Sequence, residues 1–261
     1  MFAVDTHVHL YREYDATRLF RAAAAHAAKA AQQAGIVLES LVLCLTEGSD
    51  AGAFETLARG ERGVRCAPTG EPVALRVEGF GLPIFMVRGR QIVSREGLET
   101  LAIGRPGQWP DRQMDLGDLI ARIAADGGRA IVPWGVGKWR GHRGAVLREL
   151  IRRDDRPPFA LGDNGGRPWF WAWPRHFRLA AARGIAILPG SDPLPIPGEE
   201  ATAGRCLAVA EAEIDPAHPA TSLVRALSEG RFSPLAAGGR EKLGRFIRNQ
   251  YRIRRTKTSR V

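Results

Sequence analysis

The sequence predicts an α/β protein built as one irregular, TIM-like (β/α) barrel with a β-meander insertion and a C-terminal helical extension. Three observations predict this fold: an alternating apolar strand opens the chain, strands and amphipathic helices alternate along most of it, and one central stretch holds short β segments between glycines. With 261 residues, 44% of them hydrophobic, the chain can bury one sizeable core. We expect a barrel domain over residues 1–235 and a basic helix and tail over residues 236–261.

The first part of the chain predicts a β-α-β-α order. After the opening strand, Asp15 or Thr17 can cap an alanine-rich helix that runs to about Gln33, because alanine favours helix strongly. Gly35 ends this helix. Residues 36–45 then predict a buried strand, and a short helix follows it. This alternation is typical of a parallel sheet.

The stretch from residue 64 to 104 differs from the rest. Short β segments replace helix-linked units there, and glycines separate them, which predicts a meander. The predicted segments are residues 73–77, 83–87, 91–93 and 98–103.

Helix and strand alternate again after the meander, as a barrel requires. The predicted elements are helices over 116–125, 143–153, 174–183 and 221–228, strands over 130–136, 159–161, 185–188 and 206–210, and a basic amphipathic helix over 240–252.

The composition bears on the location and the partners. The three cysteines are isolated, no apolar run reaches the roughly 20 residues of a membrane span, and the chain does not open like a signal peptide. We therefore expect a cytoplasmic protein with reduced thiols. The net charge of +10 favours an anionic, phosphorylated small molecule as substrate. Arg245, Arg248 and Arg252 share one side of the C-terminal helix, so nucleic acid is a second possible partner. The sequence leaves the oligomeric state open.

The strongest chemical signal is the motif Asp5-Thr6-His7-Val8-His9-Leu10 at the end of the opening strand. Side chains two residues apart on a strand point the same way, so we expect His7 and His9 side by side. Two neutral imidazoles form the beginning of a transition-metal site. In a barrel, the carboxyl ends of the strands together form the site. Carboxylates expected near other strand ends are those of Glu47, Glu99 and Asp192.

This motif resembles the first motif of the PHP (polymerase and histidinol phosphatase) superfamily of metal-dependent phosphoesterases. The resemblance covers roughly residues 2–200 and implies a PHP-like barrel with a divalent-metal site. It implies His7, His9 and Asp192 as metal ligands, completed by Glu47 or Glu99. Other stretches similar to the family, in the family's order, are residues 34–53, 87–104, 128–138 and 184–193.

Several positions depart from the family's pattern. Glu47 stands where the family has Asp, and Glu99 stands where it has His. A glutamate after a strand also caps helices easily, so Glu47 has that second interpretation. We expect Zn²⁺, Mn²⁺ or Fe²⁺ and fewer ions than the family's three-metal cluster. The remaining departures are Gly48, Gln91, Pro133-Trp134 and Leu194.

The sequence thus favours a metal-dependent hydrolase of phosphoesters that uses a metal-activated water at the barrel mouth. The alternative is a catalytically degenerate barrel that serves as a binding or scaffold protein, with nucleic acid among its conceivable partners. No P-loop, dinucleotide-binding or serine-hydrolase motif is present. The predicted catalytic residues are Lys138 and Asp192, and the predicted substrate-binding residues are Lys138, Arg140, His142 and Asn164.

Overall fold

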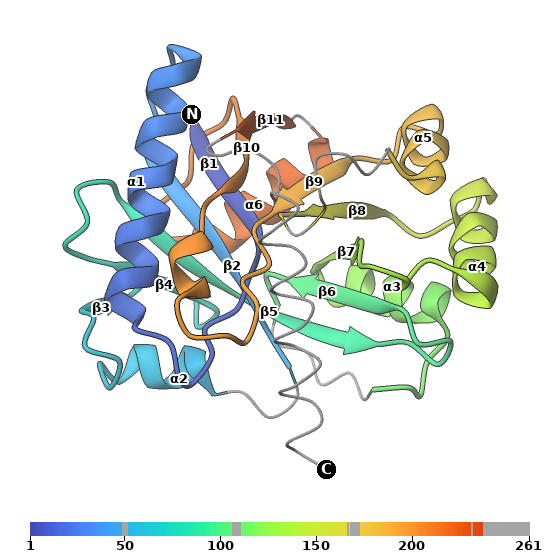
Figure 1. Cartoon of the computed structure of the whole chain (residues 1–261), viewed down its shortest axis with the longest axis horizontal. Helices are drawn as coiled ribbons and strands as arrows, with labels where there is room; N and C mark the ends of the chain where they lie inside the picture. The colour runs from blue at the N-terminus through green and yellow to red at the C-terminus, as the bar shows by residue number, and fades with distance from the viewer. Residues whose placement is uncertain (49–51, 106–110, 166, 168–172, 231, 237–261) are drawn as a thin grey trace.

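The computed structural model describes residues 1–48, 52–105, 111–165, 167, 173–230 and 232–236 (Figure 1). Its strands are β1 (Phe2–Val8), β2 (Ser40–Glu47), β3 (Cys66–Pro68), β4 (Ala74–Val77), β5 (Ile84–Val93), β6 (Glu99–Ile103), β7 (Arg129–Pro133), β8 (Phe159–Asn164), β9 (Ile187–Gly190), β10 (Cys206–Ala210) and β11 (Phe232–Ala236). Its helices are α1 (Ala16–Ala34), α2 (Ala53–Ala58), α3 (Leu116–Ala125), α4 (Gly141–Arg152), α5 (Arg175–Ala182), α6 (Pro219–Glu229) and the 3-10 helix η1 (Glu199–Thr202).

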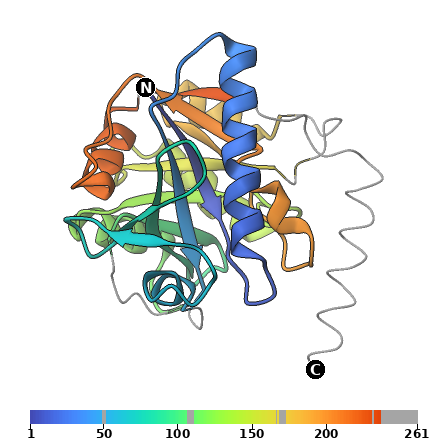
Figure 2. The ribbon, with the colours of Figure 1, turned by 90° about the vertical axis from the view of Figure 1, so that its left-hand side faces the viewer.

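The strands form one mixed sheet in the order β11-β10-β1-β2-β5-β6-β7-β8-β9, and β3 and β4 extend it beside β5. The last strand of this order, β9, curls back against β1. There the Thr6 hydroxyl donates to Pro189 O at 2.9 Å, and Asp192 N donates to His7 O at 2.8 Å. The sheet is therefore a nearly closed barrel with helices on its outside, as Figures 1 and 2 show, and the predicted α/β barrel is confirmed.

The predicted meander is confirmed, because β3, β4, β5 and β6 pair antiparallel in succession. Its boundaries are different, however: residues 84–93 form one strand where the sequence predicted two. Gly89 lies inside this strand, where a Cβ would sit 2.9 Å from Ala102 O and 3.2 Å from Leu45 O. The glycine thus permits a close approach of neighbouring backbones and does not end a strand.

Local signals place the helices close to their predicted positions. Asp15 Oδ1 accepts from Arg18 N at 3.1 Å and caps α1, and Gly35 ends the helix with φ +66°. Helix α3 has the predicted bounds. Helix α6 begins with Pro219 after a turn and packs against the barrel's interior layer.

A register shift in β1 decides which way its histidines point. Ala3 and Val8 pack in the same core layer with α1, although they are five positions apart in the sequence and regular alternation would place them on opposite faces. The pairing with β2 shifts register between Asp5 and Val8, which restores Val8 to the α1 side. His7 and His9 flank Val8 and therefore face the other way, into the mouth of the barrel.

The separate C-terminal region and the cytoplasmic location both stay predictions. The basic C-terminal helix and tail, residues 237–261, lie outside the described residues, so the proposed division at residue 235 stays a prediction. The cytoplasmic location also stays a prediction. In the described part of the chain, none of the helices combines the length and hydropathy that crossing a membrane requires.

Candidate metal centre

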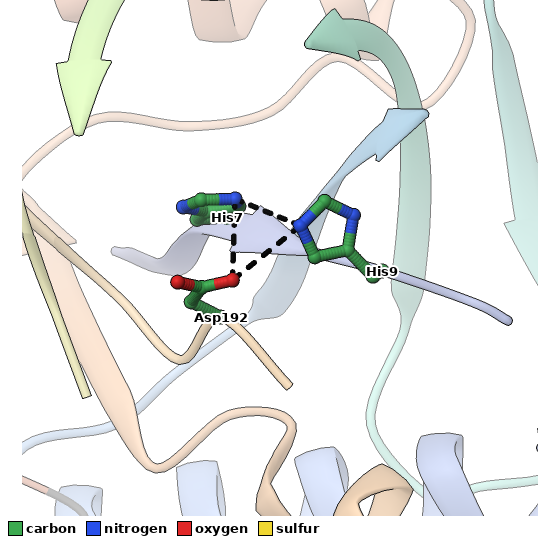
Figure 3. A group of neighbouring side chains, drawn as sticks. All are labelled: His7, His9 and Asp192. Carbon is green, nitrogen blue, oxygen red and sulfur yellow. Dashed lines mark hydrogen bonds and ion pairs between the residues drawn. The ribbon is translucent and has the colours of Figure 1, made fainter. Parts of the chain in front are cut away.

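The ends of β1 and β9 bring His7, His9 and Asp192 into one group (Figure 3). The Nε2 atoms of the two histidines lie 3.0 Å apart. Asp192 Oδ1 lies 3.5 Å from His7 Nε2 and 3.4 Å from His9 Nε2. Within the described part of the chain, these three residues form a group whose ligand atoms all lie within 4.8 Å of one another. Asp192 reaches it from a left-handed backbone conformation, φ +45°.

The spacing and the chemistry of these atoms fit a divalent cation. Ligand atoms bound at about 2.0–2.1 Å to a tetrahedral metal lie about 3.3 Å from one another, close to the separations measured here. Lone pairs of two imidazole nitrogens and a carboxylate oxygen repel one another unless a proton or a cation lies between them. Two imidazoles with a carboxylate suit Zn²⁺, Mn²⁺ or Fe²⁺. The group can therefore hold a metal ion.

Burial and charge set the protonation states of the group. Burial lowers the pKa of His7 to about 4, so its ring is neutral at pH 7, the form that binds metals. Burial raises the pKa of Asp192, but His7, His9 and the Lys138 ammonium outweigh that effect and hold it below its usual range. The His9 and Asp192 side chains are 11% and 20% exposed, so the group is open to solvent on one side.

Asp5, at the start of the same motif, is a structural centre behind the group. Its buried carboxylate accepts from His7 N at 3.2 Å, Ser191 N at 2.9 Å and Gly204 N at 2.9 Å, and also from the Ser191 hydroxyl. These bonds tie the end of β1 to the segment that carries Asp192. Asp5 thus positions both halves of the group, a role that the sequence did not reveal because its partners are distant in the chain.

Asn164, predicted to bind substrate, lies against Asp192. Its Nδ2 donates to Asp192 Oδ2 and to Trp134 O, both at 2.7 Å. One carboxylate oxygen of Asp192 is thereby held by Asn164, while the other faces the two imidazoles. Contacts of this kind orient a metal ligand and fix the direction of its lone pairs.

Glu47, predicted as a ligand, does not join the three-residue group. Its Oε1 accepts from Ala53 N at 2.6 Å and from Phe54 N at 3.3 Å, so it caps the start of α2. Its Oε2 lies 3.9 Å from Arg88 Nε. The side chain therefore has the capping role that the sequence had offered as its second interpretation.

Glu99 lies at the same mouth but is paired with Lys138, whose ammonium donates to its Oε2. Lys138 is close enough to act electrostatically on both His7 and Asp192. Its side chain folds over Gly135, where a Cβ would lie 2.8 Å from Lys138 Cε and 2.9 Å from Cγ. The absence of a side chain at Gly135 thus leaves the space that the lysine occupies.

Arg140 and His142 are exposed at the start of α4. Among the residues that the structure describes, no contact joins either side chain to the three-residue group, so their role stays a prediction. Two further side chains neighbour the group. Gln91 stands at one of the positions where the sequence departs from the family's pattern, and Tyr11 was not predicted from the sequence. Gln91 acts on His7 as a side-chain hydrogen-bond partner, and the Tyr11 ring centroid lies 5.3 Å from that of His9. The spacing of Tyr11, two residues after His9, is the signal that could have indicated it.

Comparisons with known proteins show the fold. A scan against models of protein families found no match, and a search of curated proteins also found none. Among solved structures, PsfC from Pseudomonas syringae PB-5123 matches with a TM-score of 0.57 and 16% identity, over 99% of this chain and 98% of that one. This likeness supports the architecture over the whole length of the chain.

Two further solved structures match with lower TM-scores. One is a two-domain protein from Bacteroides vulgatus containing a predicted PHP-like metal-dependent phosphoesterase, with a TM-score of 0.45 and 13% identity, over 89% of this chain and 64% of that one. The other is a candidate metal-dependent phosphoesterase from Bifidobacterium adolescentis, with a TM-score of 0.37 and 14% identity, over 72% and 86%.

Proposed function

We propose that this protein is a metal-dependent hydrolase of phosphoesters, with a divalent cation held by His7, His9 and Asp192. The observation that carries the proposal is the convergence of three ligand atoms, 3.0 to 3.5 Å apart, at the open mouth of the barrel. A cation bound there would lower the pKa of water and polarise a phosphoryl oxygen. The fold and the basic composition support an anionic substrate.

The residues around the group have separate tasks in this proposal. Asp5 and Asn164 hold the ligands in place through the hydrogen bonds described above. Lys138 lies close enough to act on both His7 and Asp192, and its positive charge would offset charge that develops on the phosphoryl group. Its bond to Glu99 fixes the ammonium before substrate binds. Asp192 is both a ligand and the acceptor that orients a water molecule beside the phosphorus atom.

The predicted substrate contacts of Arg140 and His142 belong to the same proposal. Both lie where the chain leaves the end of β7, which is the mouth side of a barrel. An exposed guanidinium at this place can reach a second anionic group on a substrate such as a sugar phosphate. Glu47 and Glu99 complete the metal's coordination only if they exchange their present partners.

Metal analysis of the purified protein tests the proposal. We expect about one divalent ion per chain after reconstitution with Zn²⁺ or Mn²⁺, and its loss in His7→Ala, because removing one of three protein ligands leaves too few to hold the ion. The matched control is His218→Ala, which removes an exposed histidine far from the group in sequence. Turnover of a chromogenic phosphoester with added Mn²⁺ must follow the metal content across the same variants.

The scaffold alternative predicts a different result. Glu47 accepts a hydrogen bond from the backbone of α2, and Glu99 accepts one from Lys138. These contacts favour a barrel that has lost its catalytic ions. Wild-type protein that takes up no metal supports this alternative and contradicts the hydrolase. Metal bound at His7 without turnover of any phosphoester retains the metal centre and rejects the catalytic role.

A further inference from the structure

Helices α4 and α5 lie side by side on the outside of the barrel, at the right-hand edge of Figure 1. His176 Nε2 donates to Gly144 O at 2.9 Å across the pair, and Trp139 packs edge-to-face against both His176 and Phe177. A Cβ at Gly144 would collide with the carbonyl of Trp139. The two helices are thus held at a fixed and close spacing, so the side chains on their outer surfaces form one face.

This face is strongly basic. Between residues 140 and 183 the chain has ten arginines and four acidic residues. We define the α4–α5 face by Arg148, Arg152, Trp173, Arg175 and Arg178. Arg148 and Arg175 both lie near enough to His176 to lower its pKa, in addition to the larger effect of burial. Across the residues that the structure describes, none of these four arginines has an ion-pair partner.

Two of the nearby acidic residues are engaged elsewhere. Asp154 pairs with Arg183, and Asp155 pairs with Arg153 through two hydrogen bonds. Glu149 is exposed, directly follows Arg148 and is the one acidic residue within α4 and α5. With four arginines against this one glutamate, the α4–α5 face keeps a net positive charge.

An exposed aromatic ring adjoins this charge. Trp173 is 50% exposed, one of three large hydrophobic residues that stand out on the described surface. Its ring centroid lies 6.0 Å from that of Phe177 at an interplanar angle of 86°, so an edge contact holds the indole. Arg175 follows it two residues later, which places a guanidinium and an indole at the same end of α5.

We propose that the α4–α5 face binds single-stranded nucleic acid. Planar guanidinium groups recognise phosphates along a backbone, and an exposed indole can stack on an unpaired base. Basic grooves that contain aromatic side chains are typical of single-strand binding without sequence preference. A membrane surface fits less well, because a lone tryptophan provides little apolar area for insertion. The inference goes beyond phosphoester hydrolysis and does not depend on it.

Fluorescence anisotropy with a labelled oligothymidylate of about 20 nucleotides, in EDTA, tests this inference without the metal centre. We expect wild-type binding to weaken with rising salt, since each phosphate contact contributes about 0.7 to the slope of log K against log salt. Arg175→Gln/Arg178→Gln should reduce that slope by about 1.4. Arg21→Gln/Arg76→Gln, which removes two exposed arginines from α1 and β4, is the matched control and should leave it unchanged.

The stacking contact is tested separately. Trp173→Ala should weaken binding by about fivefold or more, and Trp173→Phe should restore most of it, because any aromatic face can stack on a base. A DNA duplex should bind more weakly than the single strand. Equal binding of duplex and single strand, an equal loss in the control variant, or wild-type affinity in Trp173→Ala would each overturn the proposal. His7→Ala should bind the oligonucleotide like wild type, so failure of the hydrolase leaves this result intact.

Discussion

The two sides of the barrel mouth use their carboxylates differently. On the β1–β9 side, Asp192 faces two imidazoles, and its second oxygen is held by Asn164. On the β2–β6 side, the carboxylate of Glu47 accepts from the backbone of α2, and that of Glu99 accepts from Lys138. Residues of one chemical class thus have three different roles within one mouth.

This difference shows that the hydrogen-bond donors nearest to a carboxylate determine its structural or metal-binding role. The Oδ1 atom of Asp192 faces the lone pairs of two imidazoles, so a cation is the partner that satisfies it best. Glu47 meets free backbone N–H groups at a helix start, which are ready-made hydrogen-bond donors. Glu99 meets an ammonium that already neutralises its charge. A metal-binding role therefore requires unsatisfied acceptors that converge.

The largest effect on metal binding is expected from Asp192→Ala. We expect metal affinity to fall by more than about 100-fold, because loss of a direct ligand should exceed the 10- to 100-fold cost typical of losing its outer-shell partner. Equilibrium dialysis with Zn²⁺ measures the effect. The control, Asp155→Ala, removes an exposed carboxylate that pairs with Arg153. Unchanged Zn²⁺ affinity in Asp192→Ala would show that His7, His9 and Asp192 do not form a metal centre.

A smaller effect is expected from Asn164→Ala. Without the Nδ2 donor, Asp192 Oδ2 loses its anchor and the carboxylate can rotate away from the imidazoles. We expect a loss of metal affinity of about 10- to 100-fold. Asn164→Leu is the informative companion, because it keeps a similar size while it removes the donor and adds no charge, and it should also lose affinity. If both variants bind metal like wild type, Asn164 does not position Asp192.

Gly135→Ala tests the position of the Lys138 side chain without removing a charge. Gly135 does not have a left-handed backbone, so alanine is tolerated there, but its Cβ would displace the side chain of Lys138. We expect kcat for a phosphoester to fall by about 10- to 100-fold while the metal content stays near wild type. Lys138→Met should give a similar or larger loss. Normal kcat in both variants would show that the ammonium only neutralises Glu99.

The smallest effect is expected from Glu47→Ala. Loss of the cap on α2 should lower the free energy of unfolding by about 1 kcal/mol, and metal affinity should not change. Chemical denaturation followed by circular dichroism measures the free energy of unfolding, and equilibrium dialysis measures the metal affinity. Glu61→Ala, which breaks an exposed ion pair with Arg59, is the control and should leave stability close to that of wild type. Loss of metal in Glu47→Ala would mean that Glu47 exchanges its cap for the ion.

Much of the fold could be predicted because its signals are local. Asp15 and Gly35 bound α1 through contacts within a few residues, and the apolar period of α3 fixes its ends. The continuity of β5 and the existence of β11 could not be predicted in the same way. Both depend on pairing with strands that are distant in the chain, and Gly89 is compatible with either a turn or a close backbone contact.

Alternation over two residues is a property of the backbone, so the sequence alone predicted that His7 and His9 share one side of a strand. Tertiary packing, through the register shift in β1, set where that side faces and whether an acid meets it there. It likewise decided that Glu47 and Glu99 are held by other donors. The physical reason is that a hydrogen bond or a metal site depends on the distance between atoms, and for residues far apart in the chain that distance is set only by packing.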